Sequence, residues 1–384
     1  MHITTTDISL SLLLGPQLAA FADAGYEVIG VSAPGPYVPK LRAQGIEFMP
    51  LRHATRAMAP WRDVAAFEEL RRLFAEARPD IVHTHNPKPG VYGRLAARAA
   101  RVQVIVNTVH GLYAQPTDPW LRRAAVYGLE RLAAKCSHAE LVQNAEDLPV
   151  LMRLGVDRAK LHVLGNGIDL RRFDPARVPT EARVRMRADW GISDGEVVCG
   201  VVGRLVWEKG LREILEAARL LRRVAPKLRF VVVGPRDNAK GNALAEHDIE
   251  SAQDLGNVRF VGEREDIESC YAAFDLYTLA SYREGFPRSA MEAAAMGLPI
   301  VATNIRGCRQ VVDHEATGLL VEPRDARQLA EAIRRLSDND TDRRRMGHAA
   351  RAKALLDFDQ QRCIDLTLDV YAAHLGRSRT RAAA

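Results

Sequence analysis

The sequence predicts an α/β protein of two Rossmann-like domains, and three observations lead to this prediction. The chain has 384 residues, which is long for one hydrophobic core and sufficient for two. Short apolar runs alternate with segments of helical pattern, as in parallel sheets covered by helices. The composition, 47% hydrophobic and 27% charged, is typical of a globular protein that folds in water.

The first half contains seven candidate strands with helices between them. The expected strands are 2–5, 27–31, 46–50, 81–85, 104–109, 139–142 and 161–164. The expected helices are 15–24, 61–77, 89–100 and 119–134. In a doubly wound sheet the C-terminal ends of such strands bind the ligands, so the residues that follow each strand are the candidates for a site.

A second set of elements begins after a linker at 169–180 that contains Asp, Pro and Arg. Strands are expected at 197–202, 230–233, 258–261, 277–280, 300–302 and 317–323. Helices are expected at 181–190, from 212 onward, at 325–337, 341–355 and 359–374. We therefore place the domains at 1–179 and 180–356, with 357–384 forming a helix that returns to the first domain and a disordered tail.

The stretch 279–297 carries the strongest local signal. It reads Leu-Ala-Ser-Tyr-Arg-Glu-Gly-Phe-Pro-Arg-Ser-Ala-Met-Glu-Ala-Ala-Ala-Met-Gly, which predicts a loop that becomes a helix. Pro287 suits the first helical position, and Gly297 suits its end. The free N–H groups and partial positive charge of a helix N-terminus attract phosphate.

Glu284 and Glu292 lie on either side of this helix start. Eight residues of pure helix span about 12 Å, close to the length of a sugar, a diphosphate and a ribose in a row. One carboxylate could bind sugar hydroxyls and the other ribose hydroxyls. Two glutamates alone are better explained by a helix that has one capping and one solvent-facing carboxylate, so the surrounding motifs decide.

Strand 197–202 runs into a basic turn, Gly203-Arg-Leu-Val-Trp-Glu-Lys-Gly. Arg204 and Lys209 are five residues apart in this turn and can converge on one anion. Arg binds two phosphate oxygens at once, whereas Lys acts as a point charge. Such a turn upstream of the two glutamates predicts a diphosphate site.

In the first half, His85 and Asn86 follow strand 81–85, and His110 follows strand 104–109. His83 alternates with apolar positions, so we expect it to be structural. A lone histidine at a strand end, such as His110, is more often a satisfied turn residue than a ligand.

The loop after the first strand, 4–11, has no glycine before Gly15. Asp7 and Ser9 there could contact an acceptor or cap the next helix, and the cap is the simpler interpretation.

Taken together, these motifs resemble those of the retaining glycosyltransferases of family 4, over nearly the whole chain. The Glu-(seven residues)-Glu string, the Gly-Arg-Leu…Lys-Gly turn, the His-Gly pair 110–111 and Gly-Asn-Gly-Ile-Asp at 165–169 occur in the expected order. The resemblance implies the GT-B architecture, in which two Rossmann-like domains face each other across a cleft. The C-terminal domain would bind a nucleotide sugar and the N-terminal domain the acceptor.

The resemblance also implies roles for individual residues. The catalytic set would be His110, Arg204, Lys209 and Glu284. The donor-binding set would be Gly203, Arg204, Lys209, Arg264, Gly285, Phe286, Pro287 and Glu292. The acceptor side would include Asp7, Ser9, His85, Asn86 and Asn166. Many family members carry glycines after the first strand, and their absence here argues against a backbone phosphate cradle in that loop.

The resemblance implies retention of the anomeric configuration. Since no carboxylate nucleophile is marked, we expect a front-face route in which the leaving phosphate helps to deprotonate the acceptor. Arg204 and Lys209 would stabilise the leaving group in place of a divalent ion. We therefore expect no metal and no other cofactor, with a nucleotide sugar, most simply a UDP-sugar, as substrate.

The formal charge is +6, and residues 52–135 alone contain 14 Lys and Arg against 7 Asp and Glu. This basic region suits acidic lipid headgroups or phosphate-bearing acceptors. Segments 53–61 and 118–131 mix Arg with Trp, Leu or Met, as helices at a membrane interface do, although an ordinary amphipathic helix docked on the sheet has the same pattern. With 6% aromatic residues and no basic–aromatic strip, nucleic acid is not an expected partner.

The start of the chain lacks the basic region of a signal peptide, and no apolar run reaches the ~18 residues of a membrane helix. Five scattered cysteines are typical of free thiols in a reducing compartment. We expect a cytoplasmic enzyme that extends a polyprenyl-diphosphate-linked sugar, and a peripheral position on the inner face of the membrane is one of the two interpretations of the basic segments. Alternatives are a soluble small-molecule acceptor, a sugar-nucleotide epimerase, and a non-catalytic sugar-nucleotide-binding protein.

Overall fold

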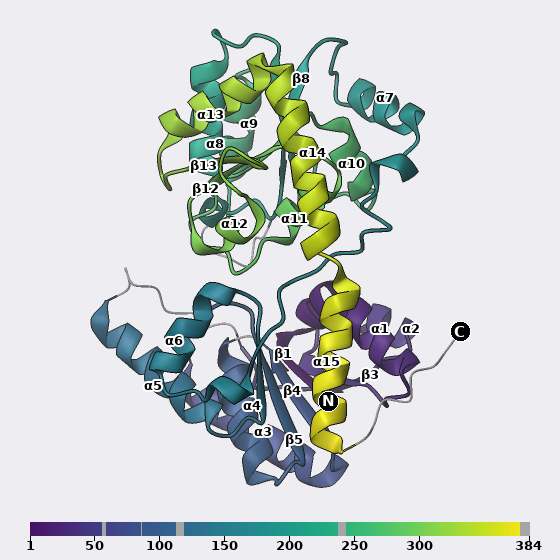
Figure 1. Cartoon of the computed structure of the whole chain (residues 1–384), viewed down its shortest axis with the longest axis vertical. Coiled ribbons are helices and arrows are strands. Elements are labelled where there is room, and N and C mark those ends of the chain that lie inside the picture. The colour runs from purple at the N-terminus through teal and green to yellow at the C-terminus, as the bar shows by residue number, and fades with distance from the viewer. Residues whose placement is uncertain (56–58, 86, 113–118, 237–242, 377–384) are drawn as a thin grey trace. The chain divides into compact units, whose positions relative to one another are not determined.

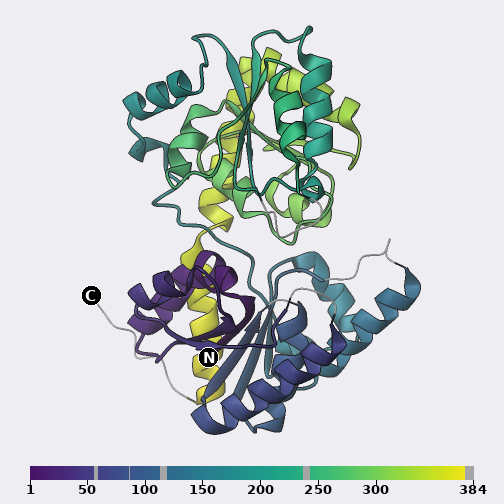
Figure 2. The same cartoon turned by 180° about the vertical axis from the view of Figure 1, so that it is seen from behind.

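The computed structural model describes residues 1–55, 59–85, 87–112, 119–236 and 243–376 (Figure 1). Contacts divide the chain into two compact units. Unit 1 comprises Met1–Gly165 and the segment that begins at Gln361, and unit 2 comprises Asn166–Gln360. In each unit, helices cover both faces of a central sheet (Figure 2).

Unit 1 is built on a seven-stranded parallel sheet with the order β3-β2-β1-β4-β5-β6-β7. The strands are β1 His2–Thr6, β2 Ile29–Ala33, β3 Glu47–Pro50, β4 Ile81–His85, β5 Val104–Val109, β6 Ala139–Val142 and β7 Leu161–Val163. The strand order reverses between β1 and β4, which lie side by side although 74 residues separate Thr6 from Ile81 in the chain.

The helices of unit 1 are α1 Gly15–Asp23, α2 Val38–Ala43, α3 Pro60–Ala77, α4 Pro87–Ala99, α5 Trp120–Ala134, α6 Leu148–Arg153 and α15 Gln360–Leu375. A π-helix, Ser9–Leu14, precedes α1. One apolar cluster joins α1 and α15 through Phe21, Leu368 and Tyr371, and a second joins α3 and α4 through Leu70 and Tyr92. The last helix thus packs within unit 1.

Unit 2 has a six-stranded parallel sheet with the order β10-β9-β8-β11-β12-β13. Its strands are β8 Val197–Val202, β9 Leu228–Val233, β10 Val258–Phe260, β11 Leu276–Leu279, β12 Ile300–Thr303 and β13 Gly318–Val321. Its helices are α7 Thr180–Asp189, α8 Leu211–Leu221, α9 Glu246–Gln253, α10 Ile267–Ala273, α11 Arg288–Ala295, α12 Arg306–Val311, α13 Ala326–Asp338 and α14 Asp340–Asp357. Here the order reverses between β8 and β11.

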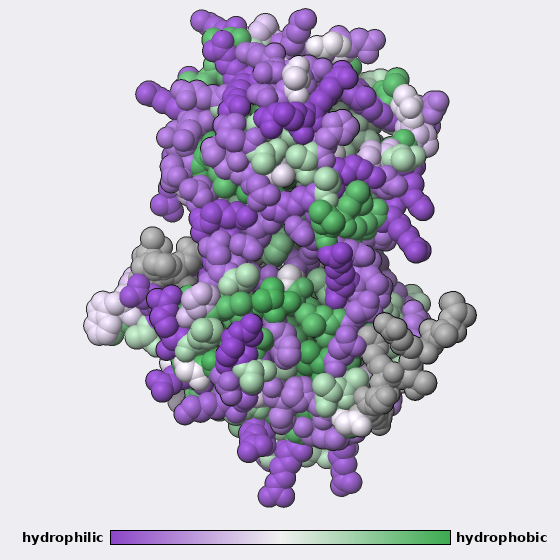
Figure 3. All heavy atoms as spheres, in the orientation of Figure 1, coloured by the Kyte–Doolittle hydropathy of each residue, from purple (hydrophilic) through white to green (hydrophobic). Residues whose placement is uncertain are grey.

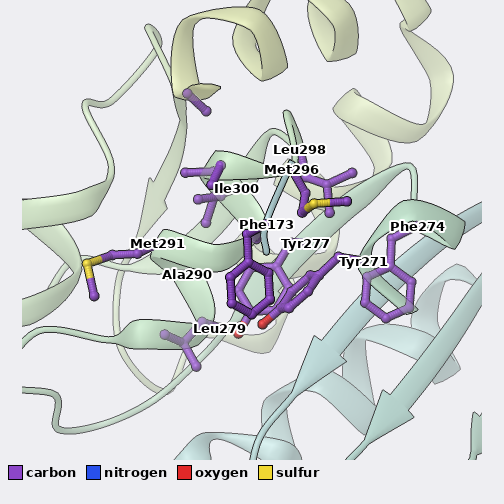
Figure 4. Close-up of a cluster of buried hydrophobic side chains, with 14 of the residues drawn as sticks. Phe173, Tyr271, Phe274, Tyr277, Leu279, Ala290, Met291, Met296, Leu298 and Ile300 are labelled. Atoms are coloured by element: carbon purple, nitrogen blue, oxygen red, sulfur yellow. The ribbon is translucent and has the colours of Figure 1, made fainter. Parts of the chain in front are cut away.

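A buried aromatic cluster holds α10, β11 and α11 together in unit 2 (Figure 4). Tyr271 and Tyr277 are fully buried in it, with ring centroids 6.0 Å apart. Phe173 packs on Tyr271 at 5.9 Å. Since Phe173 and Ile168 belong to this cluster, the stretch 166–179 lies with unit 2, whereas the sequence analysis ended the first domain at 179.

The expected strands and the long helices occur close to the anticipated positions, with β2 starting two residues later than expected. Five short helices were not anticipated, namely α2, α6, α9, α10 and α12. The five cysteines are free thiols, as expected. Hydrophilic side chains cover most of the face in Figure 3, with local hydrophobic patches on both units. No helix in the described part of the chain combines the length and apolar content needed to cross a bilayer.

Candidate active site

The reversal of strand order in unit 2 brings two predicted motifs together. β8 and β11 are parallel neighbours, so the loops that leave their C-terminal ends lie side by side. The β8 loop carries Arg204 and Lys209, and the β11 loop carries Glu284. Ligands of doubly wound sheets bind at such switch points.

The two loops are joined by an ion pair and by a backbone hydrogen bond. Lys209 Nζ lies 2.6 Å from Glu284 Oε1, and Tyr282 N–H donates to the Glu208 carbonyl at 3.1 Å. Gly210 makes the approach sterically feasible, because a Cβ at this position would lie 1.9 Å from the Ala280 carbonyl oxygen. Its φ of +71° also favours glycine.

Helix α11 begins at Arg288, with Pro287 as its N-cap rather than its first residue. No side chain caps this end, and Met291 N–H makes its bond to the Pro287 carbonyl. The first N–H groups of an α-helix have no partner within the helix, so the start of α11 offers donors beside Glu284. Gly307 permits close packing on this loop, because a Cβ there would lie 2.5 Å from the Glu284 carbonyl oxygen.

Glu292 lies one turn inside α11, where Tyr271 holds it. The Tyr271 hydroxyl is 2.9 Å from Glu292 Oε2 and 3.0 Å from the Ser289 carbonyl. Burial raises the pKa of Glu292, and the charge of Arg288 and the Tyr271 hydrogen bond counteract this rise. The sequence analysis missed Tyr271, since the helix that carries it, α10, has only seven residues and no period to reveal it.

The other donor-side residues have mixed surroundings. Arg204 is half-buried in the same loop as Lys209. Phe286 packs edge-on against Phe358, with centroids 5.9 Å apart. Arg264 follows β10 and is exposed, and its guanidinium binds the Asp266 carboxylate at 2.9 and 2.7 Å. The structure therefore brings Lys209 and Glu284 together beside the start of α11. Arg204 lies in the same loop as Lys209, and Arg264 is paired with Asp266.

The predicted histidines of unit 1 lie at the ends of β4 and β5. His85 Nδ1 is 3.2 Å from His110 Nε2, and His110 Nδ1 is 3.1 Å from Gln143 Oε1. Burial lowers the pKa of His110 to about 4, so His110 is neutral near pH 7. His83, expected to be structural, is buried between Tyr371 and Thr108 at 2.5 and 2.7 Å.

Two other acceptor-side candidates, Asp7 and Ser9, have hydrogen-bond partners within unit 1. Both Asp7 carboxylate oxygens accept backbone N–H groups, from Ile8 and Tyr37, so Asp7 ties two loops together. Ser9 Oγ lies 3.4 Å from the Thr6 hydroxyl and does not cap the π-helix. Asn86 lies outside the described residues.

Asn166, predicted on the acceptor side, belongs to unit 2. Its side-chain amide donates to the Phe286 carbonyl at 3.1 Å. The sequence analysis placed Asn166 on the acceptor side because it follows the last strand of unit 1. In the structure it packs against the loop that carries Phe286 in unit 2.

Asp-x-Asp triplets, a common arrangement for metal-bound diphosphates, occur at 338–340, 340–342 and 357–359. The first two lie where α13 meets α14. There Asp340 pairs with Arg343 at 2.9 Å, and Asp342 pairs with Arg345 at 3.1 Å. These carboxylates serve helix ends and not the β8–β11 switch point.

Comparisons with known proteins agree with this picture. Residues 17–172 match the model of "Glycosyltransferase Family 4", and residues 183–353 match "Glycosyl transferases group 1". The chain is 32% identical over 314 residues to the UDP-Gal:alpha-D-GlcNAc-diphosphoundecaprenol alpha-1,3-galactosyltransferase of Escherichia coli, covering 81% of this chain and 79% of that protein.

It is also 27% identical over 361 residues to the N,N'-diacetylbacillosaminyl-diphospho-undecaprenol alpha-1,3-N-acetylgalactosaminyltransferase of Campylobacter jejuni, covering 93% of each chain. The crystal structure of Anabaena Alr3699/HepE in complex with UDP and glucose superposes with a TM-score of 0.79 at 20% identity, over 97% of this chain and 98% of that one.

Two parallel-sheet Rossmann-like units and these matches define a glycosyltransferase of the GT-B class, as the sequence predicted. The chain belongs to the family 4 glycosyltransferases, with the group 1 domain in its second half. It is therefore an enzyme that transfers a glycosyl group from a nucleotide sugar.

Proposed function

We propose that this enzyme transfers a sugar from a UDP-sugar to a sugar carried on polyprenyl diphosphate, in polysaccharide assembly. The observation that carries the donor half is the meeting of Lys209, Glu284 and the α11 start at the switch point of unit 2. Support for the acceptor half comes from the two relatives, whose names state lipid-diphosphate-linked sugars as their acceptors.

In this proposal the donor diphosphate binds Lys209, Arg204 and the first N–H groups of α11. Lysine and arginine give strong charge-assisted bonds to phosphate, and the helix dipole adds to them. Glu284, released from Lys209, accepts hydrogen bonds from hydroxyl groups of the transferred sugar. Glu292, which Tyr271 holds in place, accepts hydrogen bonds from the ribose hydroxyl groups.

The reaction retains the anomeric configuration by a front-face route. The bond between the anomeric carbon and the diphosphate oxygen breaks, and its electron pair leaves with the diphosphate. The acceptor hydroxyl oxygen bonds to the anomeric carbon on the same face, and its proton passes to an oxygen of the departing diphosphate. Lys209 and Arg204 stabilise the charge that develops there, so the proposal requires no divalent ion.

Helix α5 supports a peripheral membrane position for unit 1. Leu121, Leu129 and Leu132 are 64%, 50% and 51% exposed, and Trp120 is 70% exposed. The buried residues of this helix are Ala133 and Ala134 alone. Exposed Arg122, Arg131 and Lys135 flank the apolar side chains. An exposed apolar stripe between basic residues suits the headgroup region of an acidic bilayer, where a lipid-linked acceptor would reside.

A transfer assay with a synthetic undecaprenyl-diphosphate-linked GlcNAc in mixed micelles tests this proposal. Purified enzyme is incubated with UDP-galactose, UDP-GalNAc, UDP-glucose or UDP-GlcNAc in the presence of EDTA. The proposal predicts that one donor yields a lengthened lipid-linked product whose new linkage is α by NMR, since these donors are α-linked. Transfer only to water-soluble acceptors would contradict the lipid-linked acceptor. A β linkage would contradict retention, and complete dependence on added Mg²⁺ would contradict the metal-independent mechanism.

A further inference from the structure

Four histidines lie close together on one face of the unit 1 sheet. Side chains alternate between faces along a strand, so His83 and His85 of β4 share a face. β1 places His2 opposite His83, and β5 places Thr108 opposite His85, so His2 and His110 fall on this same face. His83 and His85 stack with ring centroids 4.2 Å apart, and His2 stacks on His85 at 5.5 Å.

Three of these histidines form a continuous hydrogen-bonded chain. His2 Nδ1 lies 3.2 Å from His85 Nε2, His85 Nδ1 lies 3.2 Å from His110 Nε2, and His110 Nδ1 lies 3.1 Å from Gln143 Oε1. His2 and His85 are 5% and 2% exposed. The chain thus runs from the buried start of β1 to the end of β5.

With the Gln143 amide oriented so that Oε1 faces His110, the last acceptor sets the proton positions along the chain. A carbonyl oxygen only accepts, so Gln143 requires the proton of His110 on Nδ1. Because burial lowers the pKa of all three histidines, each is neutral and carries one proton. His110 Nε2 is then an acceptor, His85 must donate from Nδ1, and His2 must likewise donate from Nδ1. A hydrogen bond at one ring nitrogen selects the tautomer of the other.

We propose that His2 and His85 are positioning residues that hold His110 in its neutral Nδ1–H form, so that His110 acts as a hydrogen-bond donor and not as a base. A sugar hydroxyl oxygen bound at unit 1 would replace the Gln143 carbonyl and accept the same N–H. This proposal rests on the proposed function for the identity of that ligand. The tautomer itself does not depend on it.

Among the described residues, the titratable groups that face the chain are His83 on the same face of β4 and the amino terminus, which donates to the Ile81 carbonyl at 2.8 Å. From the neighbouring 3-10 helix, Ala145–Asp147, the Asp147 carboxylate accepts the Leu112 N–H at 3.2 Å. His83 is satisfied by two hydroxyls, which accept or donate as needed.

A transition metal is the competing explanation for the histidines. Ligand nitrogens of His2, His83 and His85 lie within 4.8 Å of one another. Metal ligation needs unprotonated nitrogens. In the described structure both ring nitrogens of His83 and of His85 already have hydrogen-bond partners, which favours the chain.

The test is nuclear magnetic resonance of the full-length protein labelled with 15N-histidine, in which long-range correlations report the tautomer of each ring. The expected spectrum of the wild type shows His110 protonated at Nδ1, with no titration between pH 5.5 and pH 8. His2→Leu removes the first donor, and we expect a second His110 tautomer to appear. His2→Asn supplies an amide N–H near the position of Nδ1 and should restore the wild-type spectrum.

Tyr371→Phe is the matched control, because it removes a hydrogen bond from His83, in the same buried stack but outside the chain. It should leave the His110 signals unchanged. A wild-type His110 protonated at Nε2, an effect of Tyr371→Phe equal to that of His2→Leu, or stoichiometric zinc in the purified protein would each overturn the proposal.

The kinetic readout is kcat/KM for the UDP-sugar. In His2→Leu it should fall at pH 8, where the neutral ring populates the tautomer that lacks the Nδ1 proton, and His2→Asn should restore it. The spectra are measured without any sugar. If no donor is turned over but the tautomers are as expected, the proposed function fails and the positioning role stands. If a donor is turned over but His110 is not protonated at Nδ1, the positioning role fails and the proposed function stands.

Discussion

Lys209 and Glu284 neutralise each other across two loops that leave different strands. Their charged atoms are 2.6 Å apart, and the side chains are only 26% and 12% exposed. A diphosphate that binds Lys209 must compete with this carboxylate, and the competition frees Glu284 to accept sugar hydroxyls. In the proposed mechanism, donor binding exchanges one internal ion pair for two contacts with the substrate, which would couple recognition of the diphosphate to recognition of the sugar.

Replacing Glu284 by Gln tests the front-face route. The substitution keeps the shape of the side chain but removes the charge that balances Lys209, and we expect kcat to fall about 10²-fold. Intact-mass measurement after incubation with donor should show unmodified protein. A stable mass increase of one sugar would contradict the route. Glu208→Gln, which removes a carboxylate from the position beside Lys209, is the charge control and should retain most activity.

Tyr271→Phe should weaken donor binding and shift its pH dependence. The lost hydroxyl bonds to Glu292 Oε2 and opposes the rise in the pKa of that carboxyl, so the pKa of Glu292 should rise further in the variant. Because the charged carboxylate binds ribose hydroxyls better, affinity for UDP should decline below neutrality at a higher pH than in wild type. Calorimetric titration with UDP from pH 5 to pH 8 measures this shift.

Tyr277→Phe is the control for that experiment, since Tyr277 is equally buried in the same cluster. Its hydroxyl bonds to Ser289 Oγ at 2.8 Å. Each variant should lose about 1–2 kcal/mol of unfolding free energy, but Tyr277→Phe should keep the wild-type pH profile of UDP binding. Equal shifts in both variants would contradict a specific role of Tyr271.

Arg94→Met should destabilise unit 1 strongly. Arg94 is fully buried and bonds to Glu140 at 2.6 Å and to Glu130 at 2.8 Å. Glu140, also fully buried, accepts from Asn107 at 2.7 Å. Removing one partner of a buried pair leaves an uncompensated charge and costs about 3–5 kcal/mol. Urea unfolding measures the loss.

Arg72→Met is the control for Arg94. Arg72 pairs with Glu68 on the surface of α3 at 2.9 Å, where water screens the charges. The unfolding midpoint of this variant should stay near that of wild type. A midpoint for Arg94→Met close to that of Arg72→Met would show that the buried network contributes little.

The apolar stripe of α5 predicts binding to acidic vesicles. The wild type should co-sediment with phosphatidylglycerol vesicles. A smaller fraction of the protein should co-sediment with phosphatidylcholine vesicles, or at high salt. Leu121→Gln should weaken binding about fivefold, because burying part of a leucine contributes about 1 kcal/mol. Leu356→Gln on α14, at the same 64% exposure, should bind like wild type, and equal loss in both variants would contradict a specific role of α5.

Much of the unit 2 site could be predicted because its determinants are local. The Arg204–Lys209 turn and the Glu284–Glu292 stretch each lie within ten residues of sequence. Tyr271 could not be found in this way, because its contact with Glu292 joins two helices through tertiary packing. The same holds for His2, which reaches His85 only because β1 and β4 pair.

The excess of Lys and Arg in residues 52–135 overstates the positive charge that is exposed on the surface. Several arginines and a lysine of the basic region are occupied by nearby carboxylates. Arg94 is buried with Glu140, and Lys88 binds Asp63 at 2.5 Å. A count along the sequence cannot distinguish such internal pairs from exposed charge, so the exposed residues of α5 are the better evidence for a membrane surface.

The most direct test of the central claim is a thermal shift with UDP and the UDP-sugars in EDTA, comparing wild type with Lys209→Ala and Lys209→Arg. A ligand that binds the native state stabilises it and so raises the melting temperature. At a ligand concentration of 100 times the dissociation constant, the stabilisation is about 2.7 kcal/mol. We predict a clear rise for wild type without metal, a smaller rise for Lys209→Arg and none for Lys209→Ala. An unchanged rise in Lys209→Ala, or a rise only when Mg²⁺ is added, would contradict the assignment of the diphosphate to Lys209.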